Sequence, residues 1–303
     1  MIVDIVIKNG LMVLPSGITQ GSLVIDEGKI IGILKSGEPK ADRVIDATGK
    51  VILPGMVDMH VHLRDPGFPE RENFESGTRA AAAGGVTTVI DMPNTVPATV
   101  TLDAFNEKKA IADGKSLVDF GFIGGAGEVP PKNITELAQA GATAFKSFLI
   151  ARFKELAASD YTLYKHMQLL AELDRPLLVH AENGDLVDKF MEEAVASGRT
   201  DPMAHCDFRP DIAEIEAVMR CITLSAQTDC HLHICHISSG GTVDLLEWAQ
   251  SIDQLVTGET SANYLVFTKE AMNERGPYAK VDPPLRSKDD QLRLWEGLND
   301  GTI

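Results

Sequence analysis

Two patterns of apolar and polar residues divide the chain. Residues 1–53 alternate short β-rich apolar runs with Gly, Pro and Asp turn signals, a pattern typical of a small antiparallel sheet. From Val57 onward, short apolar runs alternate with longer amphipathic stretches. The apolar runs predict strands within residues 85–94, 117–125, 142–150, 176–183, 230–239 and 255–261, and the amphipathic stretches predict helices within residues 102–113, 161–173 and 211–227.

Strands that alternate with helices imply a parallel sheet, either a (β/α)₈ barrel or a doubly wound sheet. Polar residues fall at the ends of separate apolar runs, and a barrel would gather them at one mouth. A doubly wound nucleotide-binding sheet needs a glycine-rich loop, but Gly84-Gly85 and Gly124-Gly125 match neither GxGxxG nor a P-loop. We therefore predict an α/β TIM-type barrel over residues 54–303 and a small β-sandwich lobe from residues 1–53.

Composition narrows the classes of partner. The 303 residues are 44% hydrophobic and 24% charged, enough to bury a large core. The formal net charge of −16 opposes binding to nucleic acid or to an anionic membrane surface. No apolar stretch reaches the ~20 residues that span a bilayer, and the first residues do not resemble a signal peptide. We expect a cytoplasmic protein that binds neither nucleic acid nor membrane, with four reduced, mostly buried cysteines.

Histidines supply the first candidate chemistry. In His60-Val61-His62, side chains two positions apart on an extended segment point the same way, so both imidazoles can bind one cation. Taken alone, the pattern is equally consistent with two hydrogen-bonding histidines at a strand end. His180 and His236 lie at the ends of other predicted strands, which favours a metal site. In HLHICH the last histidine begins the loop and is the better ligand candidate.

Lys146 lies inside the apolar run ATAFKSFLI. Burial disfavours the ammonium form, and the free amine can react with carbon dioxide to give a carbamate. A carbamylated lysine is an anion with two oxygens that can bridge two metal ions. The alternative is a lysine that reaches solvent or pairs with a carboxylate.

Several motifs in order, PGMVDMHVHLRDPG, GGVTTVIDMPNT, AFKSF, VHAEN, HICHIS and DPPLR, resemble the cyclic amidohydrolases, which include dihydroorotase, allantoinase and dihydropyrimidinase (hydantoinase). The resemblance implies a (β/α)₈ barrel, a β-sandwich lobe and two zinc ions. By motif, His60 and His62 would bind the first zinc and His180 and His236 the second, with carbamylated Lys146 as the bridge. A bridging hydroxide would attack the ring carbonyl.

The same resemblance implies residues that this sequence does not contain. The family continues into a last barrel strand with an aspartate that binds the first zinc and shuttles the proton. We expect that aspartate beyond Ile303, so no catalytic residue is assigned and the barrel is expected to lack its last strand. The resemblance also implies a homo-oligomer, a dimer or a tetramer.

The prediction of the substrate rests on fewer residues than the prediction of the family. HVHLRDPG resembles dihydroorotase, in which the positions of Arg64 and Asn94 hold the substrate carboxylate, and an arginine fork suits a carboxylate. Structural pairing of these two residues is the alternative. Dihydropyrimidinases usually have a tyrosine where this chain has Ala151, yet the segment after His180 looks closer to that group and AFKSFL looks closer to allantoinase.

We therefore predict a dinuclear zinc dihydroorotase, which interconverts dihydroorotate and N-carbamoyl-aspartate in pyrimidine biosynthesis. Allantoinase and dihydropyrimidinase are the alternatives within the family. A non-catalytic scaffold that keeps the barrel is the alternative of another class.

Overall fold

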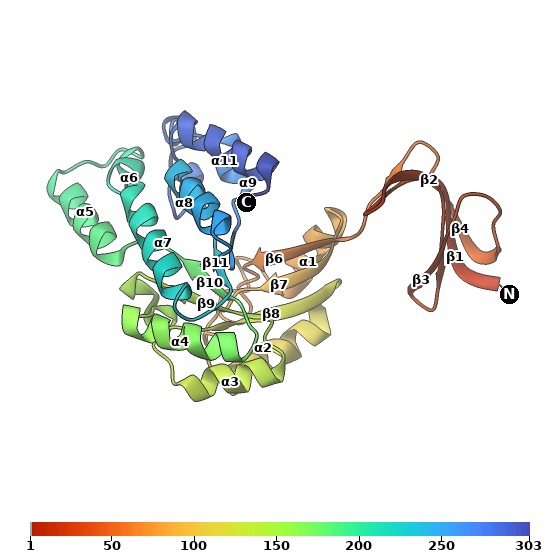
Figure 1. Cartoon of the computed structure of the whole chain (residues 1–303), viewed down its shortest axis with the longest axis horizontal. Coiled ribbons are helices and arrows are strands. Elements are labelled where there is room, and N and C mark those ends of the chain that lie inside the picture. The colour runs from red at the N-terminus through yellow and green to blue at the C-terminus, as the bar shows by residue number, and fades with distance from the viewer. Residues whose placement is uncertain (1) are drawn as a thin grey trace. The chain divides into compact units, whose positions relative to one another are not determined.

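The computed structural model describes residues 2–303, and Figure 1 traces the chain from strand to helix. The chain forms two compact units. Unit 1 contains residues 1–57 and 85–87, and unit 2 contains residues 58–84 and 88–303.

Unit 1 is built on one five-stranded sheet. Its strands are β1 (Ile2–Leu14), β2 (Gly17–Asp26), β3 (Lys29–Leu34), β4 (Lys40–Asp46) and β5 (Val51–Ile52). The order is β3-β2-β1-β4, and β5 also pairs with β1. The hairpins β1–β2 and β2–β3 are antiparallel as predicted, but β4 and β5 run parallel to β1. The antiparallel prediction fails there because the chain crosses from one edge of the sheet to the other between β3 and β4.

The main sheet of the fold has seven strands: β6 (Met56–Val61), β7 (Val86–Asp91), β8 (Asp119–Gly125), β9 (Ala144–Phe148), β10 (Leu177–His180), β11 (Leu232–Ile234) and β12 (Val256–Gly258). Their spatial order is their order in the chain, and the successive pairs from β7 to β12 are parallel. A doubly wound sheet reverses its strand order partway, whereas a barrel does not. The curled sheet is therefore part of a TIM-type barrel, which confirms the predicted fold class.

Helices follow the strands in the manner of a barrel. They are α1 (Phe74–Ala83), α2 (Leu102–Lys115), α3 (Pro131–Ala140), α4 (Asp160–Glu172), α5 (Gly184–Ala196), α6 (Ala204–Asp207), α7 (Ile212–Ser225), α8 (Gly240–Ser251), α9 (Ala262–Val266), α10 (Ala271–Arg275) and α11 (Lys288–Asp300), with 3₁₀ turns at Ala151–Leu156 and Gly276–Ala279. The helices predicted from the sequence are α2, α4 and α7. Neighbours pack in succession, α1 on α2, α2 on α3, α4 on α7, α7 on α8 and α8 on α11.

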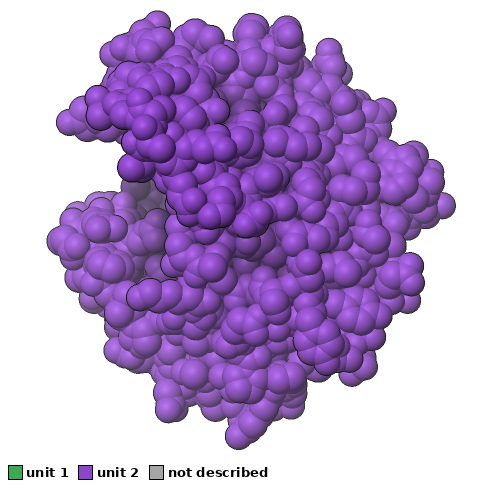
Figure 2. All heavy atoms as spheres, turned by 90° about the vertical axis from the view of Figure 1, so that its left-hand side faces the viewer, with its two compact units in different colours: residues 1–57, 85–87 green, residues 58–84, 88–303 purple. Residues whose placement is uncertain are grey.

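Figure 2 shows one face of unit 2 as spheres, hollowed at the left-hand edge of the view. No helix within residues 2–303 combines the length and apolar character needed to cross a bilayer.

An apolar cluster lies under the polar ends of the strands. Its buried members are Met92, Ile123, Ala144, Leu178 and Cys235. Side chains alternate along a strand, so the residue two positions after Ala144 or Leu178 lies on the same face, nearer the carboxyl end. Those residues are Lys146 and His180. Strand alternation thus places the two predicted ligands directly above the apolar cluster.

Candidate metal and substrate site

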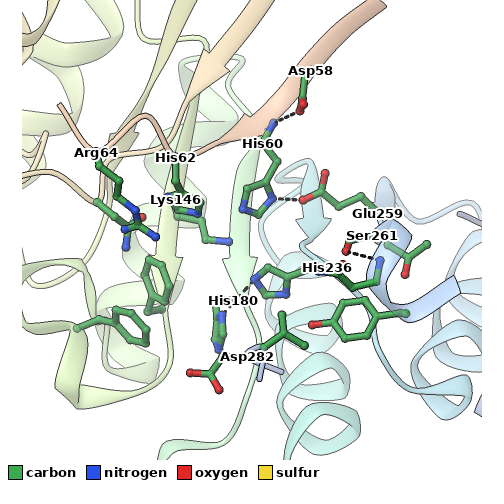
Figure 3. Close-up of a pocket in the computed structure, with 17 residues that line it drawn as sticks. Asp58, His60, His62, Arg64, Lys146, His180, His236, Glu259, Ser261 and Asp282 are labelled. Atoms are coloured by element: carbon green, nitrogen blue, oxygen red, sulfur yellow. Dashed lines mark hydrogen bonds and ion pairs between the residues drawn. The ribbon is translucent and has the colours of Figure 1, made fainter. Parts of the chain in front are cut away.

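A cavity of about 730 Å³ opens among the carboxyl ends of the unit 2 strands. All seven residues predicted for the site line it: His60, His62, Arg64, Asn94, Lys146, His180 and His236. They come from β6 and the loop after it, the loop after β7, strands β9 and β10, and the turn after β11 (Figure 3). The structure therefore brings together residues that are up to 176 positions apart, from His60 to His236, in one cavity.

The four histidines form one continuous group. Ring centres are 5.4 Å apart for His60 and His62, 5.5 Å for His60 and His236, and 4.7 Å for His180 and His236. Nδ1 of His180 lies 3.1 Å from Nε2 of His236. His236 has a left-handed φ of 41°, a conformation that a non-glycine residue rarely adopts and that turns the chain after β11. This turn brings its ring against His180.

Burial keeps these imidazoles neutral. It lowers the pKa of His60 and of His180, and it lowers the pKa of His62 and His236 well below the ordinary value. A neutral imidazole offers a nitrogen lone pair, which is the form that binds a metal ion. The group is therefore ready to bind a cation at neutral pH.

Lys146 is the unusual member of the cavity. Its side chain is 1% exposed, and Nζ has no hydrogen-bond partner among the described residues. Nζ lies 5.2 Å from the ring centre of Phe148. An ammonium in this position would repel a cation, whereas a carbamate would supply two oxygen ligands. Nδ1 of His62 and Nδ1 of His236 are also buried without a partner, so the donor set fits a metal centre.

Two carboxylates that we did not include in the predicted site each contact one histidine. Glu259, at the end of β12, bonds Nδ1 of His60, and Glu182 lies 2.6 Å from Nε2 of His180. A carboxylate behind a metal-binding histidine fixes its tautomer and ring orientation. Glu182 follows His180 by two positions, so same-side spacing could have revealed it. The partnership of His60 with Glu259 spans 199 residues and leaves no local signal.

Both carboxylates stay ionised despite burial. Burial alone raises the pKa of Glu182, but hydrogen bonds from His180 and Arg209 outweigh it and lower the pKa to about 2. Burial likewise raises the pKa of Glu259, and the nearby His233 together with the hydrogen bond from His60 brings it well below its usual range. His60 and His180 therefore each face a negative charge, from Glu259 in the cavity lining and from Glu182 buried behind the lining.

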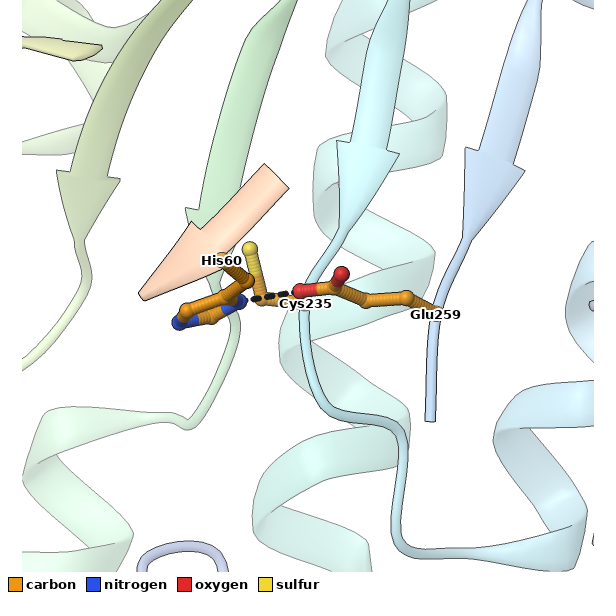
Figure 4. Close-up of side chains that lie close together, drawn as sticks. All are labelled: His60, Cys235 and Glu259. Atoms are coloured by element: carbon orange, nitrogen blue, oxygen red, sulfur yellow. Dashed lines mark hydrogen bonds and ion pairs between the residues drawn. The ribbon is translucent and has the colours of Figure 1, made fainter. Parts of the chain in front are cut away.

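Cys235 lies beside His60 and Glu259, and ligand atoms of the three residues lie within 4.8 Å of one another (Figure 4). Burial raises the pKa of the Cys235 thiol to about 11, so the thiol is protonated at neutral pH when no metal ion is bound. Cys235 belongs to the apolar cluster under the site. All four cysteines are free and buried, as predicted.

Arg64 and Asn94, the two residues predicted to contact the substrate, have polar groups without a protein partner in the part of the chain that the structure describes. Within residues 2–303 the Arg64 guanidinium makes no hydrogen bond or ion pair with another side chain, and Oδ1 of Asn94 is buried without a partner. Structural pairing at the mouth, the alternative raised from the sequence, is absent there. Both groups line the cavity and can therefore contact a ligand.

A buried ion pair supports the loops that carry these residues. Nζ of Lys108 lies 2.6 Å from Asp91, and both side chains are fully buried. Lys108 also donates to the carbonyl of Met92 at 2.7 Å, and Asp91 accepts from the backbone N–H of Leu63 at 2.7 Å. The pair thus ties the loop after β6 to the loop after β7. Nothing in the local sequence pattern identifies it.

Aromatic rings form an apolar part of the cavity lining. Phe148 and Phe153 stack with ring centres 4.0 Å apart, and both line the cavity. Phe153 comes from the 3₁₀ turn that begins at Ala151. The position where dihydropyrimidinases usually have a tyrosine is Ala151, and here Phe153 supplies a ring from two residues further along.

Comparisons with known proteins agree with this geometry. The dihydro-orotase-like family matches residues 49–241. An allantoinase of Desulfitobacterium hafniense (strain Y51) is 38% identical over 305 residues, covering 99% of this chain and 68% of the relative. An L-hydantoinase of Paenarthrobacter aurescens is 38% identical over 306 residues, covering 99% of this chain and 66% of the relative.

The solved structure of an L-hydantoinase (dihydropyrimidinase) from Arthrobacter aurescens superposes with a TM-score of 0.96 at 37% identity, covering 99% of this chain and 68% of that chain. The chain thus spans about two thirds of the length of these relatives. Their names are those of allantoinase and hydantoinase, so the comparisons favour the alternatives raised from the sequence over dihydroorotase.

Proposed function

Because the chain belongs to the dihydroorotase-like family of cyclic amide hydrolases, we propose that its cavity opens a hydantoin ring, with allantoin as the preferred substrate. Allantoin is a hydantoin that carries a ureido group, so allantoinases and hydantoinases act on the same ring. The observation that carries the proposal is the pair of unpartnered polar groups, Arg64 and Asn94, in the cavity that holds the four histidines and Lys146. This choice replaces dihydroorotate.

We assign the metal ligands as the sequence predicted. His60 and His62 would hold a first zinc ion, His180 and His236 a second, and carbamylated Lys146 would bridge them. The metal ions, when bound, lower the pKa of water and polarise the ring carbonyl. The family's proton-shuttling aspartate is assigned to no residue of this chain.

In this proposal Arg64 and Asn94 orient the substrate. A ureido group carries both a carbonyl oxygen and N–H donors. Arg64 can donate to the oxygen, and Oδ1 of Asn94 can accept from an N–H. The carboxylate of dihydroorotate offers acceptors only, so Oδ1 of Asn94 would have to pair with a ring N–H instead, whereas the ureido group can serve both side chains at once. This difference favours a ureide over dihydroorotate.

A hydantoin with an apolar substituent is the second candidate. The stacked rings of Phe148 and Phe153 favour it, because they give the cavity an apolar side against which such a group would pack. The likeness to the L-hydantoinase structure supports the same reading.

Turnover tests the proposal directly. The full-length protein, purified and reconstituted with zinc, would be assayed on allantoin, 5-benzylhydantoin and dihydroorotate, with metal content measured in parallel. We expect the highest kcat/KM on allantoin and a loss of about 1–3 kcal/mol in transition-state binding of allantoin for Arg64→Met. Arg79→Met, at an exposed ion pair on α1, serves as the control. Preferred turnover of dihydroorotate would overturn the substrate, and no bound metal after reconstitution would support the scaffold alternative.

A further inference from the structure

A buried arginine, Arg209, lies outside the set of predicted ligands and supports the site from behind. This arginine lies between α6 and α7, and its side chain is 1% exposed. Nε donates to Oε1 of Glu182 at 2.6 Å, and Nη2 bonds the other carboxylate oxygen, so the pair is bidentate. Glu182 has no exposed surface and holds His180 by its other contact. Arg209 is therefore linked to the cavity-lining residue His180 through one intervening side chain, Glu182.

The third nitrogen of the same guanidinium points to a different part of the site. Nη1 donates to Oδ1 of Asp282 at 2.6 Å. Asp282 lines the cavity, on the segment between the last 3₁₀ turn and α11, and its carboxylate also accepts from Arg152 at 3.1 Å. One rigid fork thus contacts both the carboxylate behind His180 and a residue that faces the substrate.

Arg209 itself is held from the other side. Arg286 donates to the backbone carbonyl of Arg209 at 2.6 Å and to Oγ of Ser238 at 3.0 Å. Ser238 follows His236 by two residues. The loop that carries Arg209 is thereby fastened to the turn that carries another predicted ligand, which limits how far the guanidinium can shift.

We propose that Arg209 is a positioning residue that fixes the orientation of His180 through Glu182 and the position of the cavity-lining segment through Asp282. This inference rests on the proposed metal-binding role of His180. Arg209 contacts neither the predicted ligands nor the cavity, so its effect passes through two carboxylates. Because the two contacts are made by different nitrogens, their effects are separable by mutation.

Metal binding is the first readout. In Arg209→Met the buried carboxylate of Glu182 loses its partner, and His180 loses a fixed orientation. We expect the bound zinc to fall from about two to about one per chain, with the affinity of the weaker site reduced about 10- to 100-fold in a chelator competition. Arg209→Lys, which keeps one charged contact, should recover part of the lost affinity.

Substrate binding is the second readout. Asp282→Asn removes the charge on the cavity side and leaves the Glu182 contact in place. We expect this variant to keep both zinc ions and to raise KM several-fold with a smaller change in kcat. Arg199→Met is the matched control, since Arg199 also pairs with two carboxylates, Asp201 and Asp207, but on an exposed surface.

The outcomes separate the inference from the proposed function. Retention of both zinc ions at wild-type affinity in Arg209→Met would overturn the positioning role. Parallel loss of both zinc ions in Arg209→Met would also overturn it, because that result describes general structural damage rather than a role at one half of the site. A wild-type protein that binds no zinc would instead overturn the proposed function.

Discussion

The two halves of the candidate metal site perform the same task with different chemistry. On one side His60 bonds Glu259, which His233 approaches to 3.7 Å. On the other side His180 bonds Glu182, which Arg209 grips with two nitrogens. One carboxylate is approached by a second imidazole and the other is held by a permanent positive charge.

Solvent access explains the difference. The Glu259 side chain is 22% exposed, so water can stabilise part of its charge, and His233 needs only to orient it. Glu182 is fully buried and has no such help. A buried carboxylate without a counter-charge is strongly unfavourable, so only a cation such as Arg209 can hold it there. Burial therefore decides which kind of partner each half-site requires.

The largest effect should come from the residue that both half-sites share. Lys146→Met removes the proposed bridge, and we expect both zinc ions to be lost and activity to fall by more than about 100-fold, beyond the effect of any outer partner. Native mass spectrometry should show the added mass of carbon dioxide on the wild-type chain and not on the variant. Full zinc binding by Lys146→Met would contradict the role of Lys146 as the bridging ligand. Lys109→Met, at an exposed ion pair on α2, is the control.

The next largest effect should be on the free energy of unfolding, which should differ between variants of Arg209 and of His233. Arg209→Met leaves Glu182 as an unpaired buried charge and should lower the free energy of unfolding of the metal-free protein by about 3–5 kcal/mol. His233→Leu leaves Glu259 bonded to His60 and should cost about 1–2 kcal/mol. Urea denaturation followed by tryptophan fluorescence is suitable, because both tryptophans, Trp248 and Trp295, lie in unit 2. Equal losses would contradict the role we give to burial.

Metal affinity should then separate the carboxylates themselves. Glu182→Gln and Glu259→Gln each keep the shape of the side chain and remove its charge. We expect each to weaken one zinc site about 10- to 100-fold and to leave the other near its wild-type affinity. Competition with a chromophoric chelator would resolve the two sites. If both variants weakened the same site, the assignment of one carboxylate to each half-site would be wrong.

The smallest effect lies at the outer end of the first half-site. Oγ1 of Thr257 lies 2.9 Å from Nδ1 of His233 and 3.1 Å from Nε2 of His231. Thr257→Val should therefore cost about 1 kcal/mol of unfolding free energy and leave zinc binding almost unchanged. Thr257→Ser retains the hydroxyl and should remain closer to the wild type. A loss of zinc in Thr257→Val would mean that the chain from Thr257 to His60 matters more than we infer.

Periodicity was sufficient to predict the main sheet. Each of the six apolar runs after β6 contains a strand, and the amphipathic stretches became α2, α4 and α7. Unit 1 was harder, because the hairpins were visible as turn signals but the parallel pairing of β4 with β1 depends on a crossing of the sheet. Local patterns specify strands, whereas pairing between distant strands depends on the path of the chain.

The sequence by itself determined the barrel class from strand-end positions, which meet at one edge of a parallel sheet. Its motifs, through the family resemblance, identified the family and completed the set of seven predicted residues, all of which line one cavity. Only the tertiary structure decided what supports those residues. Glu259 reaches His60, Arg209 reaches Glu182 and Lys108 reaches Asp91 across loops and strands. Such pairs form because a buried charge must find a hydrogen-bond partner or a counter-charge wherever the fold places one, and no spacing along the chain records that requirement.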